Sequence, residues 1–309
     1  MGQLVDGVWQ AKDLPRTSAN GEFVRKASTF RSWLGDEAFP AAADRYHLFV
    51  NAGCPWAYRT ILYRSIKGLS DLISLSYTQP AAGPEGWTFG SPEELLGAQH
   101  MHDVYTAADA SFTGRCTVPV LWDKESHTIV NNESADIIRM LDYAFNDFSG
   151  VSNSRYYPAD LSDEIDSLNE VIYTNVNNGV YRCGFAQSQS AYDAAFDALF
   201  GTLDELDERL ASQRYLCGDQ VTEADWRLFA TLVRFDLAYH GQFRCNRQML
   251  MDYPNLWPYC RDLYQLPGVA ETVDVQAIRG IYYGSRAPGV LPKGPEVNFN
   301  ELHGREHLS

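Results

Sequence analysis

The sequence lacks three features that would each indicate a class of protein. No apolar run approaches the roughly 20 residues of a membrane-spanning helix, and residues 1–16 contain no apolar stretch like that of a signal peptide. Positive charge is scarce as well, since the formal net charge is −15. An acidic chain is poorly suited to nucleic acid or an anionic membrane, because both bind basic surfaces. We therefore expect a cytoplasmic protein whose main partner is neither nucleic acid nor a membrane.

Paired cysteines are also missing. The six cysteines stand singly, none in a CxxC pair, and a chain of 309 residues does not need disulfides to fold. We expect all except Cys54 to be reduced packing residues, at positions 116, 183, 217, 245 and 260. His100 and His102 have no cysteine or carboxylate at the spacing of a zinc motif, so we expect no metal.

Short apolar runs are present between residues 41 and 150. They predict four strands and two helices in the order β-α-β and then β-β-α: strands over 46–51, 72–77, 118–123 and 128–131, and helices over 55–67 and 133–145. This order indicates an α/β thioredoxin-like N-terminal domain with a mixed sheet. Long loops within compact domains usually have a function, so we expect one for the loop over 79–115. We also expect one helix in this loop, near 92–99.

The pattern from residue 151 to 284 is helical instead. Apolar residues recur with the helical period over four stretches: 161–175, 191–211, 223–239 and 256–266. We therefore expect an all-α C-terminal domain, with a capping box at Thr222–Asp225. Residues 1–40 are expected to form an N-terminal extension that packs on the globule. Residues 285–309, rich in proline, glycine and charge, are expected to form a C-terminal tail.

Cys54 stands in the strongest local signal of the sequence. It follows a predicted strand and a turn over 51–53, and Pro55 suits the first position of a helix. A thiol at a helix N-terminus faces unpaired backbone N–H groups and the positive end of the helix dipole, which favour the nucleophilic thiolate. Residue 57 is Ala57, so an internal disulfide there is impossible. We expect a mixed disulfide with a small thiol.

Two further motifs suit a small peptide ligand that carries a thiol. Val118-Pro119 opens a strand, where a proline fits an edge or a cis bond in a tight turn. Ser134 can cap the helix that follows, so that its N–H groups bind a carboxylate, and Glu133 can bind an ammonium group. Together with Cys54 these groups match a tripeptide with a γ-glutamyl end and a central thiol. A strand-start proline and an ordinary polar cap are the plain alternatives.

With these motifs the sequence resembles the glutathione transferases, and a longer series of motifs resembles one class of them. Eight stretches between about residue 20 and residue 295 are similar to the glutathionyl-hydroquinone reductases, the Xi class: Phe30–Trp33, Arg45–Leu48, Cys54–Ala57, Gly86–Phe89, Thr117–Asp123, Asn131–Ser134, Asn177–Arg182 and Asp252–Leu256. The resemblance implies the glutathione transferase fold and a homodimer. It also implies the reduction of glutathionyl-hydroquinones to hydroquinones, with glutathione as co-substrate.

The resemblance further implies roles for individual residues. Cys54 is implied as the nucleophile and Tyr181 as the proton donor, with Tyr239 and Tyr282 near the thiol, where their hydroxyls would stabilise the thiolate. Seven residues are implied to contact glutathione: Trp87, Arg115, Cys116, Thr117, Val118, Glu133 and Ser134. Because the chain has 18 tyrosines, packing is the plain alternative for the three named here.

Two departures from the class and two other functions stay open. Gly53 replaces the usual alanine, which we expect to loosen the turn before Cys54, and the Ser285-Arg286 region lacks the usual Ser-His pair. A glutathione thiol transferase of the Omega kind, acting on mixed disulfides or dehydroascorbate, would share Cys54 but need no proton donor to carbon. A non-catalytic protein that binds aromatic ligands would have an unreactive Cys54.

Overall fold

The computed structural model describes residues 2–12, 16–284 and 290–308, which divide into two compact units. The first unit is drawn from 1–15, 26–154 and 271–291, and the second from 16–25, 155–270 and 292–309. Each unit therefore contains segments that lie far apart in the sequence. The domain boundaries inferred from the sequence stay a prediction.

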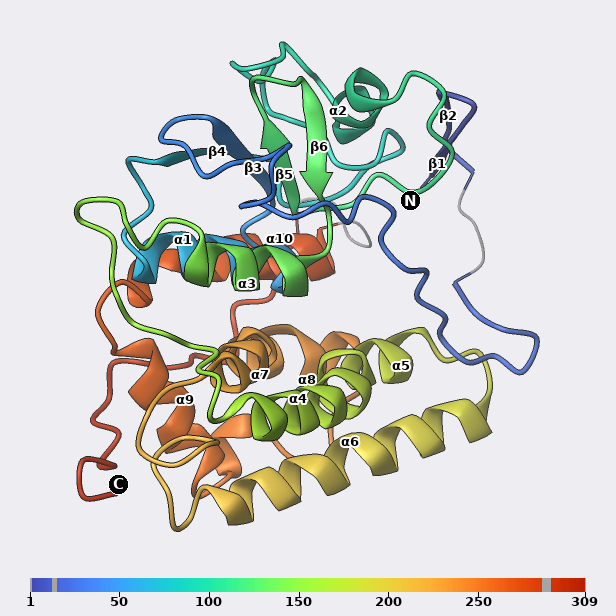
Figure 1. Cartoon of the computed structure of the whole chain (residues 1–309). Coiled ribbons are helices and arrows are strands. Elements are labelled where there is room, and N and C mark those ends of the chain that lie inside the picture. The colour runs from blue at the N-terminus through green and yellow to red at the C-terminus, as the bar shows by residue number, and fades with distance from the viewer. Residues whose placement is uncertain (1, 13–15, 285–289, 309) are drawn as a thin grey trace. The chain divides into compact units, whose positions relative to one another are not determined.

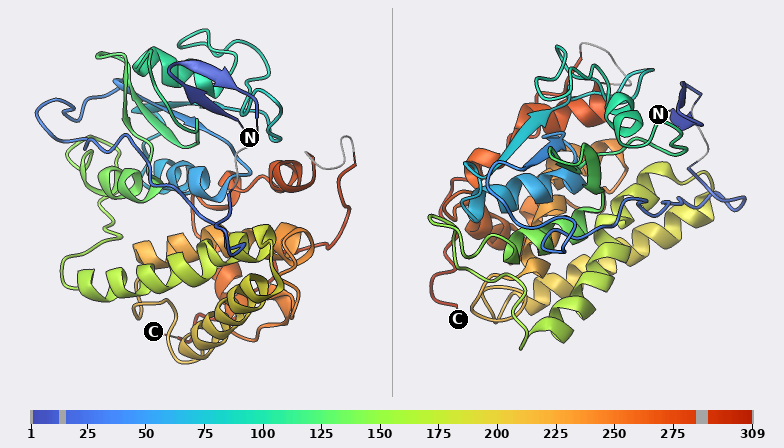
Figure 2. Two further views of the ribbon diagram at one scale, coloured as in Figure 1. Left: turned by 90° about the vertical axis from the view of Figure 1, so that its right-hand side faces the viewer. Right: turned by 45° about the horizontal axis from the view of Figure 1, so that its top comes forward.

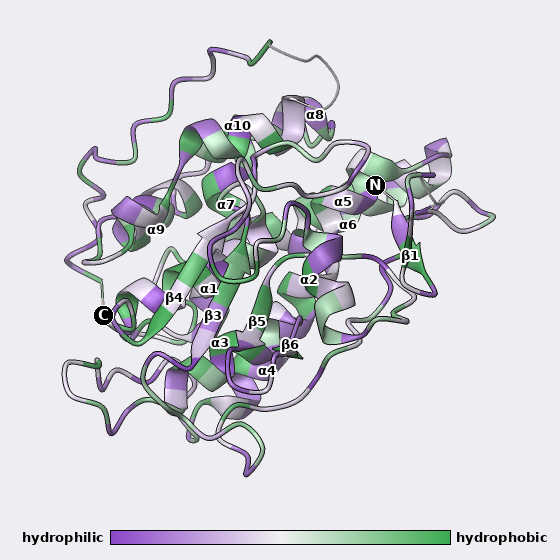
Figure 3. Ribbon diagram, turned by 90° about the horizontal axis from the view of Figure 1, so that it is seen from above, coloured by the Kyte–Doolittle hydropathy of each residue, from purple (hydrophilic) through white to green (hydrophobic). Residues whose placement is uncertain are grey.

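A four-stranded sheet forms the centre of the first unit, in the order β4-β3-β5-β6 (Figure 1). Strand β3 (Tyr46–Val50) runs parallel to β4 (Ile73–Tyr77) and antiparallel to β5 (Val120–Asp123), which pairs antiparallel with β6 (Thr128–Asn131). Every residue of β3 and β5 is buried, and Figure 3 colours β5 mainly as hydrophobic. The mixed sheet of the thioredoxin-like arrangement is confirmed.

The predicted helices of this unit are confirmed within a few residues. Helices α1 (Pro55–Ile66) and α3 (Ser134–Tyr143) pack side by side next to the sheet (Figure 1). The helix predicted near 92–99 is wrong, because that stretch forms only a turn, which ends at Gly97 with φ of 68°. The helix of the long loop is instead α2 (Met101–Ala108).

Three further elements of the first unit were not predicted. Strands β1 (Gln3–Val5) and β2 (Val8–Gln10) form an antiparallel hairpin in the N-terminal extension. Their side chains are mostly half-buried or exposed, so the sequence carries no clear alternation of polar and apolar residues. Helix α10 (Val275–Tyr283) lies beyond the last predicted helix.

The described residues of the second unit form helices and no strand, which confirms the all-α prediction. The elements in chain order are α4 (Ser162–Val171), η1 (Ile172–Asn177), α5 (Gly179–Phe185), α6 (Gln189–Arg209), α7 (Glu223–Arg234), η2 (Phe235–Tyr239), α8 (His240–Gln242), the 3₁₀ turn η3 (Leu250–Asp252) and α9 (Leu256–Tyr264); a 3₁₀ turn η4 (Ala270–Thr272) follows. Figure 2 shows α6 as a long yellow helix.

Helix α7 forms the core of the second unit, since all twelve of its residues are buried. The predicted capping box is confirmed: the Asp225 carboxylate accepts the backbone N–H of Thr222 at 2.7 Å. Both η1 and η2 are π-helical, so two predicted helices change their hydrogen-bonding pattern near the end. No described helix is both long enough and apolar enough to cross a membrane.

Candidate active site

Cys54 directly precedes α1, as the sequence predicted. It is the N-cap residue, with φ of −74° and ψ of 123°, and Pro55 begins the helix. Its carbonyl oxygen accepts the N–H of Tyr58 at 2.9 Å, and the residue is 6% exposed. The residue thus lies at the positive end of a twelve-residue helix, where the thiolate form is favoured.

Asn51 fixes the turn that leads into Cys54. Its Oδ1 accepts the N–H groups of Gly53 at 3.0 Å and of Cys54 at 3.1 Å. Its Nδ2 donates to Thr78 Oγ1 at 2.9 Å and to the Gln79 carbonyl at 2.8 Å. This fully buried side chain therefore holds the turn against the end of β4. The sequence predicted a turn at Asn51 but not this role of its side chain.

Four of the other five cysteines are poor candidates for the nucleophile. All six are free thiols. Burial raises the pKa of the Cys116 thiol to about 12 and that of the Cys217 thiol to about 11. Burial also raises the pKa of Cys245 and Cys260 well above the ordinary thiol value. These four thiols are protonated at neutral pH and hence unreactive.

Gly53 lets the backbone of α10 approach the turn before Cys54. A Cβ at this position would lie 2.4 Å from the carbonyl oxygen of Ala277 and 2.8 Å from Cγ2 of Ile281. An alanine would therefore force the helix or the turn to move. Helix α10 carries Tyr282, which is 7% exposed. The glycine thus has a packing role, in addition to the looser turn that the resemblance suggested.

Helix α2 contacts three stretches of the chain that contain predicted glutathione-binding residues. The N–H of Met101, at the start of α2, donates to the Trp87 carbonyl at 2.8 Å. The Tyr105 hydroxyl donates to the Thr117 carbonyl at 3.0 Å and accepts the Thr117 N–H at 3.2 Å. It also accepts the Asn132 side-chain N–H at 3.0 Å. Trp87, Thr117 and Asn132 are therefore fixed relative to one another through one helix.

Tyr105 is the main residue that sequence reasoning missed. It is fully buried, and burial raises the pKa of its hydroxyl to about 12, so it stays a hydrogen-bond donor at neutral pH. The apolar residues Met101, Val104 and Tyr105 have the i, i+3, i+4 spacing of a helix. That spacing was the signal available in the sequence, although it spans too few residues to be distinctive.

Glu133, rather than Ser134, caps α3, which corrects the predicted cap. Glu133 is the N-cap, and its Oε1 accepts the N–H of Ala135 at 3.1 Å. Its Oε2 accepts the Ser28 hydroxyl at 3.0 Å. Ser134 is the first helical residue and is buried, with its Oγ 3.3 Å from Nη1 of Arg59 on α1. These contacts restrict the conformations of the Glu133 and Ser134 side chains in the absence of a ligand.

Residues 28–34 of the predicted extension lie along β6 and the start of α3. The backbone N–H of Ser32 donates to the Val130 carbonyl at 3.0 Å, and that of Phe30 donates to Asn132 Oδ1 at 3.1 Å. The Arg31 guanidinium also forms a two-pronged ion pair with Asp136 in the first turn of α3. The prediction that the extension packs on the globule is correct for this segment.

The second unit contains the other two predicted tyrosines. Tyr181 lies on α5 and Tyr239 ends η2, with their ring centroids 6.2 Å apart. Both rings pack against Phe243, and Phe23 stacks on Tyr181 at 6.0 Å. The Arg25 guanidinium lies 5.1 Å from the centre of the Tyr181 ring. Tyr239 is fully buried, whereas Tyr181 is partly exposed within an aromatic cluster.

Comparisons with known proteins agree with this arrangement. Residues 53–144 match the family described as glutathione S-transferase, N-terminal domain, and residues 189–262 match glutathione S-transferase, C-terminal domain. Glutathionyl-hydroquinone reductase YqjG of Escherichia coli strain K12 is 46% identical, over 99% of this chain and 99% of that protein. The chain belongs to the glutathionyl-hydroquinone reductases, the Xi class of glutathione transferases.

A second reductase and two solved structures are similar over nearly the whole length. Glutathionyl-hydroquinone reductase PcpF of Sphingobium chlorophenolicum is 46% identical over 96% of each chain. The glutathione-bound structure of the Escherichia coli protein gives a TM-score of 0.89 at 43% identity, covering 99% of each chain. The Xi-class transferase of Natrialba magadii gives 0.93 at 43% identity, covering 100% of this chain and 98% of that one. The predicted family and fold are confirmed.

The predicted site residues of this Xi-class chain fall in both units. The first unit contains Cys54, Tyr282 and all seven glutathione candidates, whereas the second contains Tyr181 and Tyr239. The roles assigned to these residues stay predictions. Ser285 and Arg286, where the sequence departs from the class, lie outside the described residues.

Proposed function

We propose that the chain reduces glutathionyl-hydroquinones to hydroquinones, with Cys54 as nucleophile and glutathione as reductant. The observation that supports this most strongly is Cys54 at the start of α1, with an alanine at position 57. A cysteine without a neighbouring partner thiol exchanges with a small external thiol. The glutathione bound in the Escherichia coli relative suggests which thiol this is.

The first half-reaction cleaves a carbon–sulfur bond. The Cys54 thiolate attacks the sulfur of the aryl-glutathione thioether, a sulfur–sulfur bond forms, and the electron pair of the broken bond moves to the ring carbon. That carbon takes up a proton, for which we assign Tyr181 as the donor. The products are the hydroquinone and Cys54 in a mixed disulfide with glutathione.

The second half-reaction restores the enzyme. The thiolate of a second glutathione attacks the mixed disulfide, which forms glutathione disulfide and releases the Cys54 thiolate. In the net reaction the ring keeps the electron pair of the broken carbon–sulfur bond and takes up a proton, and its former glutathionyl group leaves with the added glutathione as glutathione disulfide. We propose that the hydroxyls of Tyr239 and Tyr282 stabilise the thiolate by hydrogen bonds.

We propose that glutathione binds through residues fixed by α2 and α3. Glu133 would bind the ammonium of the γ-glutamyl group, and the N–H groups that begin α3 at Ser134 would bind its carboxylate. The backbone of Val118, which precedes Pro119 in a cis peptide bond, would pair with the peptide part of glutathione. Trp87 and the stretch of Arg115, Cys116 and Thr117 would complete the contacts.

The aromatic cluster of the second unit supports an aromatic substrate. Rings of Phe23, Phe185 and Phe243 surround Tyr181 at centroid distances of 5.3 to 6.2 Å. Such rings favour the offset or edge contacts that another aromatic ring can join. We further propose a homodimer in the cytoplasm, where the glutathione pool is kept reduced. Light scattering of the purified protein tests the dimer.

Turnover of a purified glutathionyl-hydroquinone tests the proposal. We expect wild type to release hydroquinone when glutathione is supplied, and Cys54→Ser to retain no more than a trace of activity. Cys217→Ser is the matched control, because burial raises the pKa of that partly exposed thiol, and it should remain active. Turnover of mixed disulfides without hydroquinone release would favour the Omega-type function. An unreactive Cys54 would favour binding without catalysis.

A further inference from the structure

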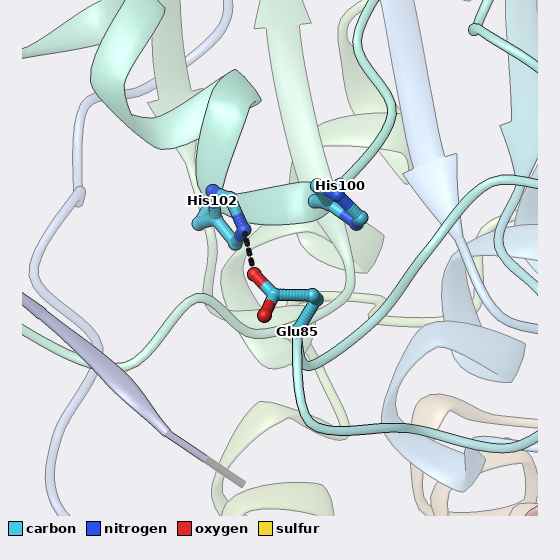
Figure 4. A group of neighbouring side chains, drawn as sticks. All are labelled: Glu85, His100 and His102. Atoms are coloured by element: carbon cyan, nitrogen blue, oxygen red, sulfur yellow. Dashed lines mark ion pairs between the residues drawn. The ribbon is translucent and has the colours of Figure 1, made fainter. Parts of the chain in front are cut away.

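Three side chains capable of binding a metal converge in the first unit, away from Cys54 in the sequence. Glu85 lies before the Gly86–Phe89 stretch, His100 precedes α2, and His102 lies in its first turn. The two stretches are joined by backbone pairing: Thr88 and His100 form an antiparallel bridge. Figure 4 shows the three side chains as neighbours, with the Glu85 carboxylate directed at the ring of His102.

The spacing of these side chains suits a small cation. One ligand atom from each residue lies within 4.8 Å of the other two. Glu85 Oε2 and His102 Nε2 are 3.4 Å apart, close to the roughly 3.3 Å that separates neighbouring ligands of a tetrahedral zinc ion. The imidazole rings of His100 and His102 are stacked with centroids 4.7 Å apart, so one ring must rotate to share the ion.

One buried nitrogen of each imidazole ring has no hydrogen-bond partner in the described part of the chain. Among the described residues, none forms a hydrogen bond with His100 Nδ1 or His102 Nε2, although both atoms are shielded from solvent. Buried polar atoms are normally paired, because an unpaired one has lost its hydrogen bonds to water without replacement. A bound ion would satisfy His102 Nε2, which faces the Glu85 carboxylate.

Asp103 lies next to the other ring nitrogen of His102. Its Oδ1 lies 3.2 Å from His102 Nδ1, and its Oδ2 is held by the N–H groups of Gln99 at 3.0 Å and His100 at 2.9 Å. A carboxylate beside Nδ1 is the usual arrangement behind a histidine that binds a metal through Nε2. Nε2 of His102 faces the Glu85 carboxylate, with Oε2 at 3.4 Å.

Trp9 of the β1–β2 hairpin supports the cluster from one side. Its ring stacks on His102 with centroids 4.7 Å apart and an angle of 23° between the planes. Its Nε1 donates to the Pro84 carbonyl at 3.1 Å, next to Glu85. The hairpin therefore holds both ends of the Glu85–His102 pair and limits their movement before an ion binds.

We propose that Glu85, His100 and His102 form a binding site for a divalent zinc-type ion. Two imidazoles and one carboxylate are a common ligand set for Zn²⁺, with water in the fourth position. This proposal revises the expectation that the chain binds no metal, since the carboxylate comes from fifteen residues before His100. The ion would lock the backbone of Trp87, whose carbonyl bonds to Met101 beside both histidines.

Zinc titration of the metal-free protein tests the site. The titration is made on a Cys54→Ser chain without glutathione, because both thiols would otherwise bind Zn²⁺. We expect calorimetry to give one Zn²⁺ per chain, and thermal unfolding to shift upward with added Zn²⁺. In that background, His100→Gln, His102→Gln and Glu85→Gln should each weaken binding at least tenfold. His307→Gln, an exposed histidine of the second unit, is the matched control and should bind as before.

Each alternative outcome contradicts the three-ligand site. Absence of stoichiometric binding would show that the three side chains do not hold a Zn²⁺ ion. Binding that survives all three substitutions would place the ion elsewhere. Binding that is lost with His102→Gln but kept with His100→Gln would reduce the site to a pair. Because the background lacks Cys54, these results are independent of the proposed reduction.

Discussion

Tyr181 is the residue whose proposed role distinguishes reduction at a ring carbon from simple thiol exchange. Tyr181→Phe removes one hydroxyl and keeps the ring within its aromatic cluster. If the hydroxyl protonates the leaving carbon, cleavage of a glutathionyl-hydroquinone should slow by about two to four orders of magnitude. Reduction of a glutathione mixed disulfide releases a sulfur anion, so that rate should stay nearly unchanged. Both rates are measured on one preparation.

Comparison of the two rates distinguishes the possible roles of Tyr181. Equal loss in both assays would assign Tyr181 to the thiolate or to the fold, and no loss in either would leave it as a packing residue. The melting temperature is the control for folding. It should hardly change, because packing of the ring is retained.

Ser28 is predicted to act through Glu133. Its hydroxyl holds Glu133 Oε2 at 3.0 Å, so Ser28→Ala frees that oxygen while Oε1 stays bonded to the α3 cap. If Glu133 binds the ammonium of glutathione, we expect the KM for glutathione to rise about two- to tenfold, the range of one hydrogen bond. The value of kcat should be retained, because Cys54 is unaffected.

A matched serine separates this effect from a general loss of stability. Ser212→Ala removes an exposed hydroxyl in the second unit and should leave both constants unchanged. A fall in kcat for Ser28→Ala at saturating glutathione would contradict a role in ligand positioning.

At the scale of elements, the contact between α10 and the Cys54 turn predicts an unusual cost for a small substitution. Gly53→Ala would place a Cβ 2.4 Å from the Ala277 carbonyl. Overpacking of this kind costs about 1–3 kcal/mol of unfolding free energy. Gly201→Ala on α6 is the control, since its Cβ would meet no atom within 4 Å. It should stabilise by about 0.5–1 kcal/mol, because alanine favours helix more than glycine.

Chemical denaturation of the two variants measures this difference. A neutral or stabilising effect of Gly53→Ala would show that α10 can move without cost. In that case the substitution would be compatible with the alanine usual in the class.

The packing of the long loop against the sheet predicts a pH dependence of stability. His47 on β3 is buried between Ser74 Oγ at 2.8 Å and Ser76 Oγ at 3.1 Å, and Ser76 donates to Glu93 in the loop. Burial lowers the pKa of His47 to about 4, although Glu93 opposes the shift. The folded chain therefore binds fewer protons here than the unfolded chain between about pH 6.5 and 4.

Stability should consequently fall as the pH is lowered through this window. The contribution of His47 is at most about 3 kcal/mol, from 1.36 kcal/mol for each unit of pKa. Denaturant unfolding at pH 7 and pH 4.5 measures it, and His47→Gln should reduce the difference. His127→Asn, at an exposed turn position, should keep it. An unchanged difference in His47→Gln would assign the pH dependence to other groups.

The elements that could be read from the sequence are those whose burial is continuous or periodic. Strands β3 and β5 are buried at every position, and α7 is buried throughout, so their apolar runs carried the signal. The hairpin β1–β2 and the short helix α2 bury few residues and were missed. The spacing of apolar residues alone also did not distinguish the π-helical segments η1 and η2 from the α-helices that precede them.

At the level of the whole molecule, the fold could be predicted from the sequence, whereas the individual long-range contacts could not. The order of elements and the class motifs together predicted the fold and the family. The contacts of Asn51, Tyr105 and Glu85 join segments that are many residues apart, so no local pattern contains them. Glu133 was recognised as a site residue, but its place as the cap depends on backbone angles that the sequence does not give.

A single turnover, followed by intact mass spectrometry, tests the central claim most directly. Reduced wild-type protein is mixed with a stoichiometric glutathionyl-hydroquinone and no free glutathione. The account predicts one hydroquinone released for each chain that gains one glutathionyl group, located at Cys54 by peptide mapping and removed by added glutathione. Cys54→Ser should give neither product. Hydroquinone release without the adduct, or with the adduct at another cysteine, would contradict the account.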